Sequence, residues 1–474
     1  MSLALLKNTA WGVLGEFAVR GAKIAQVILI ARLLGAENLG LFSYAIALAG
    51  LFSVLFDFGI MPVAVKTLAA HPGSGALRLF GGLKMLTSSV GILLLGGAAM
   101  LSKVSPTDAW IAFGMGVFLA LNDLATFVTV VYRARGEFWR ETALRSTMAV
   151  LQLVACVVTL LLTRSVGMMV VALIVTALLG AIPLAREWRR HPPITGTDLG
   201  WHGLRTALRQ CLPLAGAVLT GSVYMNLDIV VLGNHASMEE VGWYGVAVKA
   251  IFSLMIMPLH YLQLATLPAF ASGSSDTINA RWLRTYVLST TVGAVISLVT
   301  AMLAGQLLSV LFGASFAGAA PVLVAFSLIG FMFYLYTPLS QWLLLQGRQK
   351  QTLWFHATAM GVNLIAVPLL VPQWGLWGAV TAAFCTHLTI AFAHAAVVLR
   401  LKNFPDNRSD LLALLKLAIV TPAAIIALGL QVGGPLVSRL AAIGLFLLIS
   451  HRELISLSRY LSLASHRLFS WNTP

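Results

Sequence analysis

The sequence is poor in charged residues, above all in acidic ones. Only 10% of its 474 residues are charged, with 31 Lys and Arg against 16 Asp and Glu, and the formal net charge is +15. A soluble chain carries about a quarter charged residues, so a soluble protein is excluded. A charge of +15 would indicate nucleic acid in a soluble protein. Here most cations fall in short loops, so no nucleic-acid partner is predicted.

Cysteines and long polar loops are also scarce. The three cysteines, Cys156, Cys211 and Cys385, lie in or beside apolar segments without a CxxC pair. Neither a metal site nor a disulfide framework is therefore predicted. No predicted loop exceeds about 25 residues and no G-x-x-x-x-G-K-[ST] motif occurs, so no soluble catalytic or nucleotide-binding domain and no cofactor are expected. We also expect no cleavable signal peptide, because the first apolar segment is long and carries internal charges.

Long apolar runs dominate what is present. The chain is 59% hydrophobic, with a mean hydropathy of +0.90. Apolar runs of membrane-spanning length recur from end to end, which predicts an all-α polytopic membrane protein. We predict fourteen spans, at residues 9–31, 40–64, 80–101, 109–131, 146–163, 166–185, 211–233, 243–268, 285–305, 319–345, 353–371, 375–399, 411–430 and 434–450.

The distribution of Lys and Arg predicts the orientation of these spans. With the N-terminus placed in the cytoplasm, 23 of the 31 fall at cytoplasmic ends and loops. Three fall in outer loops, and five lie within spans, among them Lys416 and Arg439 near the C-terminus. Positive residues concentrate on the cytoplasmic side, so both termini are predicted there. We expect Lys416 and Arg439 to extend their charges toward the membrane surface.

The two halves of the chain resemble each other. Gly40 matches Gly242, Pro62 matches Pro268, Gly136 matches Gly347 and Gly167 matches Gly375, in the same order and at offsets of 202 to 211 residues. Six predicted spans separate equivalent positions, so the repeats are parallel and related by an axis near the membrane normal. This predicts six-helix lobes at 1–190 and 211–400 around a central cavity, a cytoplasmic linker at 191–210, two added helices within 401–450 and an amphipathic cytoplasmic tail at 451–474.

The first predicted span carries three charges. Glu16, Arg20 and Lys23 recur at i, i+4 and i+7, so they share one helix face. Each charge at the centre of a lipid-facing helix costs about 2.5–3.5 kcal/mol. We therefore predict that this face lines a water-filled cavity, with Glu16 either pairing with Arg20 for packing or facing the substrate.

Other polar residues within the predicted spans are further candidates for this cavity. Lys249 would add a cation from the second lobe, unless it extends outward. Asn226 and Gln263 would hydrogen-bond a polar ligand in the cavity or else hold helices together. Three acids within spans could be proton or Na⁺ sites, act as counter-ions for the cations, or simply end helices near water. These acids are Asp57, Asp123 and Asp228.

Several motifs resemble one known family. Residues 31–43 (ARLLGAENLGLFS) and Asp57-Phe58-Gly59 in the first half resemble signatures of Wzx-type polysaccharide flippases. Residues 228–233 (DIVVLG), residues 240–244 (EVGWY) with Lys249, and residues 345–380 resemble the family's second-half segments. These flippases belong to the multidrug/oligosaccharidyl-lipid/polysaccharide exporter superfamily. The resemblance covers about residues 1 to 400.

The resemblance implies a function that composition alone does not give. It implies that the chain flips an undecaprenyl-pyrophosphate-linked oligosaccharide across the bacterial inner membrane, by alternating access, for surface polysaccharide synthesis. A polysaccharide polymerase and chain-length machinery would then be partners within the same lipid membrane. Arg20, Lys23 and Lys249 suit a pyrophosphate, because Arg and Lys are the natural phosphate ligands.

Three other functions compete with this one. A lipid II flippase of the same superfamily fits the same cationic cavity. A cationic-drug exporter of the superfamily needs acids in its lumen, whereas the first span offers two cations to one acid. A membrane enzyme such as an O-antigen polymerase or ligase would need a large outer loop with catalytic Arg or His, and the longest predicted outer loop has about 13 residues. We therefore predict a transporter and not an enzyme.

Overall fold

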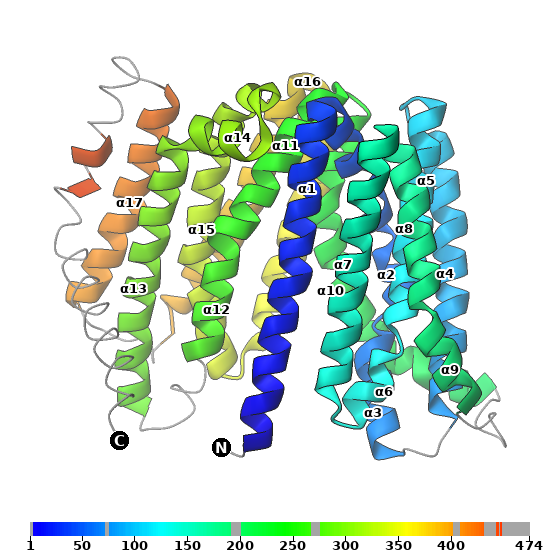
Figure 1. The fold of residues 1–474 in the computed structure, drawn as a ribbon. Helices are drawn as coiled ribbons and strands as arrows, with labels where there is room; N and C mark the ends of the chain where they lie inside the picture. Colours follow the sequence, from blue (N-terminus) through cyan, green and yellow to red (C-terminus); the bar gives the residue numbers. More distant parts are fainter. Residues whose placement is uncertain are drawn as a thin grey trace, which may run out of the picture. The chain divides into compact units, whose positions relative to one another are not determined.

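The computed structural model describes residues 3–71, 75–190, 201–266, 275–401, 408–430, 442–444 and 446–447. Helices dominate these residues, and no strand occurs among them (Figure 1). Ten helices in the described part are long and apolar enough to cross a membrane, or eleven if one bent pair, Arg205–Gly216 and Val218–Gly233, forms a single span. The chain is a multi-pass membrane protein, and the predicted all-α polytopic fold is confirmed.

The chain divides into two compact units. Unit 1 consists of residues 1–242 and 367–376, and unit 2 of residues 243–366 and 377–474. The helices of unit 1 are α1 (Leu3–Leu51), α2 (Ser53–Asp57), α3 (Ile60–Ala70), α4 (Ala76–Leu101), α5 (Pro106–Thr126), α6 (Thr129–Ala134), α7 (Phe138–Thr163), α8 (Val166–Gly180), α9 (Ile182–Arg190) and α10 (Trp201–Gly233).

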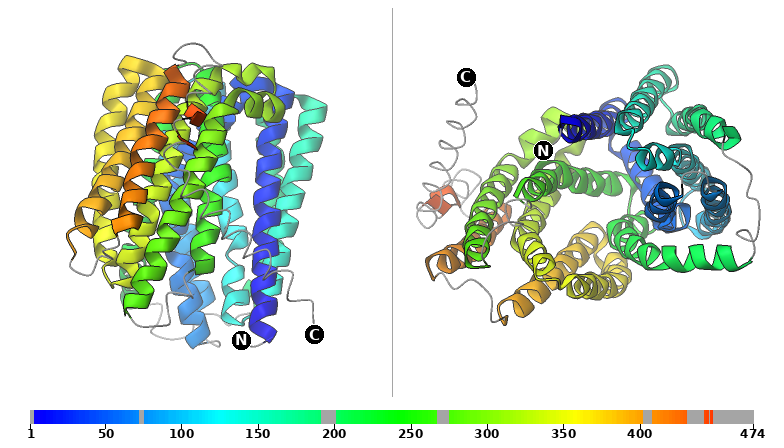
Figure 2. Two further views of the ribbon diagram at one scale, coloured as in Figure 1. Left: turned by 90° about the vertical axis from the view of Figure 1, so that its left-hand side faces the viewer. Right: turned by 90° about the horizontal axis from the view of Figure 1, so that it is seen from below.

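The remaining helices follow in chain order, the first of them beginning in unit 1. They are α11 (Met238–Ile251), the π-helix η2 (Phe252–Ile256), α12 (Met257–Thr266), α13 (Ser275–Met302), α14 (Ala304–Phe312), the 3₁₀ helix η4 (Ala314–Ala319), α15 (Ala320–Leu345), α16 (Gln349–Val398) and α17 (Arg408–Leu430). Within unit 1, α1 packs along α7, α5 and α10. Within unit 2, α13, α15 and α17 lie side by side (Figure 2).

The first thirteen predicted spans each overlap a helix or one arm of a broken helix. Two glycines outside helical geometry break the long helices: Gly35 (φ 82°) divides α1, and Gly375 (φ 51°) divides α16. Positive φ values favour glycine, which lacks a Cβ. The break at Gly35 falls between two predicted spans, whereas Gly375 is the first residue of the predicted span 375–399. Most of the predicted span 434–450 and all of the tail 451–474 lie outside the described residues.

Two segments predicted to connect spans are helical in part. The segment between the predicted spans 285–305 and 319–345 is not a loop but holds α14 and η4. Its apolar residues Leu308 and Phe312 are buried, which explains why it folds as a helix instead of remaining in water. Residues 201–210, predicted as linker, are the first ten residues of α10. The predicted six-helix lobes themselves stay a prediction.

Two of the repeat-matched glycine pairs also match in structure. Gly136 (φ 72°) and Gly347 (φ 70°) have the same left-handed conformation. In each turn the glycine N–H donates to the carbonyl three residues back, at 3.0 Å, and the next N–H donates to the carbonyl five residues back, at 2.8 Å. Such bonds end a helix at a glycine. Of the other predicted pairs, Pro268 lies outside the described residues, and Gly167 is helical where Gly375 is not.

The second of these pairs, Gly40 and Gly242, lies in direct contact within unit 1. A Cβ on Gly40 would overlap the carbonyl oxygen of Met238, and a Cβ on Gly242 would overlap that of Ala36. Ala36 and Met238 each lie four residues before one of the glycines, so the contact is reciprocal. A two-fold axis between two segments produces reciprocal contacts of this kind. The close approach of α1 and α11 therefore depends on glycine at both positions.

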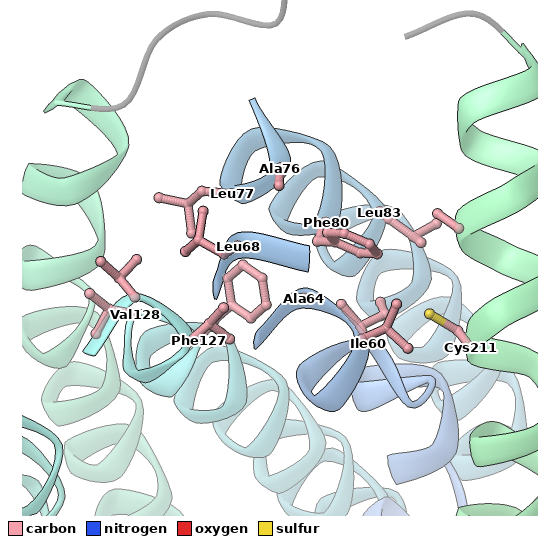
Figure 3. Close-up of a cluster of buried hydrophobic side chains, with 14 of the residues drawn as sticks. Ile60, Ala64, Leu68, Ala76, Leu77, Phe80, Leu83, Phe127, Val128 and Cys211 are labelled. Carbon is pink, nitrogen blue, oxygen red and sulfur yellow. The ribbon is translucent and has the colours of Figure 1, made fainter. Parts of the chain in front are cut away.

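A buried apolar cluster holds together one end of unit 1. It joins α3 and α4 to α10 and to the turn between α5 and α6, and its labelled side chains converge in Figure 3. Ile60, Phe127 and Cys211 are fully buried in it. Asp57 precedes this cluster at the end of α2, where Phe58 (φ 48°) and Gly59 (φ 68°) turn the chain into α3. The cluster thus fixes the chain around Asp57.

Candidate functional site

The charged face of α1 meets α7 in unit 1. Gly15 permits this, because a Cβ there would lie 2.6 Å from Cγ2 of Thr142 in α7. Glu16 accepts a hydrogen bond from Nε of Arg20 at 2.6 Å and a second, at 3.4 Å, from Arg145 of α7. The predicted pair of Glu16 and Arg20 is thus present, and a cation from another helix joins it.

Arg145 connects this pair to a second carboxylate. Its guanidinium lies 3.8 Å from Glu141, one turn earlier in α7. Glu141 also accepts two hydrogen bonds from Arg133 at the end of α6, at 2.8 and 2.5 Å. We call the resulting set the cavity group; its members are Glu16, Arg20, Lys23, Arg133, Glu141 and Arg145. Four cations against two carboxylates leave the cavity group with a net charge of +2.

Two cavities adjoin this group. One of about 280 Å³ is lined by Lys23, Arg133 and Arg145, together with uncharged polar side chains from α1, α5 and α7. Among the latter, Gln152 donates to Asn122 at 2.7 Å. A second cavity, of about 300 Å³, is lined by both carboxylates of the group, Glu16 and Glu141. Arg133 and Arg145 line both cavities, so these two side chains are accessible from either cavity.

Lys23 differs from its neighbours in the cavity group in making no close ion pair among the described residues. It is exposed, it lines the first cavity, and no carboxylate in the part of the chain that the structure describes lies within 4.0 Å of its ammonium. Arg20, by contrast, is paired with Glu16 and lines neither cavity. Within the cavity group, Lys23 is therefore the cation most readily available to an anion.

A second charge cluster lies deeper in unit 1. Lys84 of α4 is completely buried, and its ammonium lies 2.5 Å from Asp123 of α5 and 3.5 Å from Asp57 of α2. It also donates to the carbonyl of Phe56 at 3.2 Å and lies 5.7 Å from the centre of the Phe127 ring. We call Lys84, Asp57 and Asp123 the Lys84 group. Three partners surround one ammonium, as burial of a charge requires.

The sequence alone does not indicate the roles of Lys84, Arg133 and Arg145. All three count among the 23 Lys and Arg that the sequence places at cytoplasmic ends and loops. Lys84, however, lies nine residues into α4 and is not exposed at all. A usable signal was the presence of Asp57 and Asp123 within neighbouring spans, because acids at that depth need a cation. Nothing in the sequence indicated that Arg145 contacts Glu16.

Two other predicted site residues of unit 1 lie in α10. The amide of Asn226 donates to the carbonyl of Ser222 at 2.8 Å, and Ser222 bonds Ser53 at 2.8 Å. Asn226 also lies where a Cβ on Gly50 would meet it, so it sits at the packed face between α10 and α1. Asp228 is buried, and its carboxylate accepts from the N–H of Ile229 at 2.9 Å. Neither residue lines the two cavities described above.

The predicted site residues of unit 2 are Lys249 and Gln263. Lys249 lies in the last turn of α11, just before the π-helix η2. This π-helix precedes Pro258, whose missing N–H disturbs the helical hydrogen bonds at that point. The backbone carbonyl of Gln263 accepts from the amide of Gln341 at 3.5 Å. Lys416 is exposed on α17, and Arg439 lies outside the described residues.

Comparison with known proteins decides the family. A family described as polysaccharide biosynthesis protein matches residues 5–274, which is more than half of the chain. The chain belongs to this family. No curated protein sequence matches it. The family match rests on sequence, and the solved structures add evidence on the fold.

Several solved transporters share this fold. The lipid II flippase MurJ in an inward closed conformation matches 94% of this chain and 100% of its own, with a TM-score of 0.66 and 12% identity. The MATE multidrug transporter DinF-BH covers 85% of this chain and 96% of its own, with a TM-score of 0.54 and 16% identity. A MOP-superfamily transporter from Pyrococcus furiosus covers 87% of this chain and 96% of its own, with a TM-score of 0.51 and 15% identity. The predicted resemblance to polysaccharide exporters of this superfamily is confirmed.

Proposed function

We propose that the protein flips an undecaprenyl-pyrophosphate-linked oligosaccharide from the cytoplasmic to the outer leaflet of the bacterial inner membrane. Membership of the polysaccharide biosynthesis family supports this proposal, and so does the fold shared with MurJ. The observation that carries it is the cavity group: four cations against two carboxylates, beside cavities of about 280 and 300 Å³. We infer alternating access as the mechanism.

The cavity group suits an anionic headgroup that must also be released. Lys23 offers a point charge, and Arg145 offers a guanidinium fork already shared with two carboxylates. A pyrophosphate would compete with Glu16 and Glu141 for Arg145, which lowers the net gain of binding. Gln26, Asn122 and Gln152 in the same cavity supply hydrogen bonds of the kind that sugar hydroxyls accept and donate.

The remaining predicted residues have narrower proposed roles. We propose Lys249 as a cation from unit 2 and Gln263 as a polar contact to sugar. For Asn226 and Asp228 we favour the alternatives of helix packing and local bonding, because both are already hydrogen-bonded within α10. Asp57 and Asp123 are proposed as counter-ions of Lys84.

A lipid II flippase is the second candidate. The likeness to MurJ favours it, with a TM-score of 0.66 over the whole of that chain. Both candidates would place the lipid pyrophosphate beside the same cations. A cationic-drug exporter fits less well, because the cavity group carries a net positive charge. A polymerase or ligase is not proposed, since the family and the fold point to transport.

Gene deletion with analysis of the membrane lipids separates the two candidates. Accumulation of an undecaprenyl-linked oligosaccharide facing the cytoplasm, with loss of surface polysaccharide, would support the proposal. Normal surface polysaccharide with blocked peptidoglycan synthesis would contradict it and favour the lipid II flippase. The control is the same strain carrying the intact gene, which should restore the lipid pattern of the parent.

A further inference from the structure

Unit 2 contains a polar stripe that the proposed function does not use. The two arms of α16 meet along it, where Asn363 donates to Thr386 at 3.2 Å and the rings of His356 and His394 lie 6.2 Å apart. His387 lies two turns before His394 on the second arm. Histidines are rare within membrane spans and are functional candidates there by default.

Tyr336 of α15 lies against both histidines of the second arm. Its ring stacks on His387 at 6.3 Å between centroids and on His394 at 5.9 Å. Its hydroxyl lies 3.4 Å from Nδ1 of His387. Phe355 contacts His394 from the first arm, edge to face, at 4.8 Å. His394 is therefore enclosed by two aromatic rings and a second imidazole.

The hydrogen bonds of His394 fix its tautomer. Its Nδ1 lies 2.9 Å from the carbonyl oxygen of Ile390, and a carbonyl oxygen can only accept. Nδ1 therefore carries the hydrogen, and Nε2 of the neutral ring presents a bare lone pair. That Nε2 is buried and has no hydrogen-bond partner among the described residues, and the whole side chain is 0% exposed.

A lone pair in this position can bind a proton and little else. Burial of Nε2 leaves no access for a larger ligand in this packing. The face of Tyr336, whose ring centre lies 5.9 Å from that of His394, would attract an imidazolium. The groups able to titrate that face His394 are Tyr336 from α15 and His356 from the first arm of α16, with His387 on its own arm.

We propose that Nε2 of His394 is a proton-binding site whose occupation is coupled to the packing of α16 against Tyr336. A buried charge in apolar surroundings is costly, so binding of the proton favours a packing that admits water or a counter-charge. A ligand that binds two conformations unequally shifts their populations, and the shift is reciprocal. The role of this proton in coupling to transport rests on the proposed function, whereas the proton site itself does not.

The proton site can be tested without a transport substrate. Solid-state NMR of the ¹⁵N-histidine-labelled full chain in lipid bilayers would follow the imidazole nitrogens from about pH 8 down to the lowest pH at which the protein remains folded. We expect a signal from a bare Nε2 that becomes imidazolium on acidification and is missing in His394→Gln. The proposal is overturned if that signal is absent, or if it stays neutral over the whole range in which the protein remains folded.

The coupling has a natural reporter in Cys385, two residues before His387 and partly exposed. Mass spectrometry would measure alkylation at Cys385. The ratio of its rate in the wild type to its rate in His394→Gln should change by about fivefold or more between pH values above and below the midpoint of the NMR titration. Comparison with the variant at each pH removes the effect of thiol ionisation. A ratio that does not change with pH would contradict the coupling.

A matched control separates this site from histidine protonation in general. His235 has the same contact, with Nδ1 lying 2.9 Å from the carbonyl of Val231, but it is exposed. His235→Gln should leave both the bare Nε2 signal and the Cys385 ratio unchanged. His394→Asn provides a second variant if His394→Gln fails to fold. Loss of transport in the gene-deletion assay alone would not bear on the proton site.

Discussion

Lys84 and Lys23 are both lysines within long helices of unit 1, yet their surroundings are opposite. Lys84 is 0% exposed and is held by two carboxylates and a carbonyl. Lys23 is exposed to a cavity and has no carboxylate partner among the described residues. The Lys84 group has a net charge of −1, whereas the cavity group has +2. A compensated, closed charge can stabilise a fold, and an uncompensated, open one can bind a ligand.

The largest effect is expected from Lys84→Met. The change leaves Asp57 and Asp123 close together without their cation, so the protein should lose about 3–5 kcal/mol of stability. Thermal unfolding in detergent or nanodiscs would measure this loss. If the group is structural, the triple variant that also carries Asp57→Asn and Asp123→Asn should regain most of it. A stable Lys84→Met protein would contradict the assignment.

A smaller effect on stability but a large one on function is expected from Arg145→Gln. The variant removes a guanidinium that lines both cavities, and loss of a charged hydrogen bond of about 1.5–3 kcal/mol lowers affinity about 10- to 150-fold. Complementation of the deletion strain, scored as surface polysaccharide, measures the result. Arg140→Gln is the matched control, because Arg140 pairs with Glu137 at 3.0 Å on the same helix but lines neither cavity. Equal effects of both variants would sink the argument.

Glu16→Gln should act in the opposite direction on binding. It releases Arg20 and Arg145 from their shared carboxylate and raises the net charge of the cavity group to +3. Tighter holding of an anionic headgroup slows its release, so we expect KM and turnover to fall together, by about two- to tenfold. Steady-state transport in proteoliposomes would test this. A variant that raises KM would show that Glu16 contacts the substrate directly.

The smallest expected effect is the response to salt. At physiological ionic strength, salt largely screens the interaction between exposed charges that lie more than about 8 Å apart, and it screens buried pairs much less. Raising the salt concentration should therefore weaken transport a few-fold through the cavity group. The unfolding temperature, to which the Lys84 group contributes, should hardly change. A parallel fall of both would show that the two groups do not differ in exposure as described.

The helices and the charged face of α1 were predictable from sequence because both follow from periodicity along one segment. Gly40 and Gly242 were also found, as matched positions of a repeat, although their contact was not. The environments of Lys84 and Arg145 could not be predicted, because each depends on side chains from other helices. Counting positive residues near span ends places cations at the surface by default, and that default misplaced Lys84.

The most direct test of the account is the charge at position 23. Transport of the undecaprenyl-linked oligosaccharide, isolated from the deletion strain and reconstituted in proteoliposomes, would be compared for Lys23→Ala and Lys23→Arg. The exposed Lys103→Ala serves as the control outside the cavity. If Lys23 holds the headgroup, Lys23→Ala should transport about tenfold more slowly or worse, whereas Lys23→Arg and Lys103→Ala should stay near the wild-type rate. Wild-type transport by a folded Lys23→Ala protein would contradict the account.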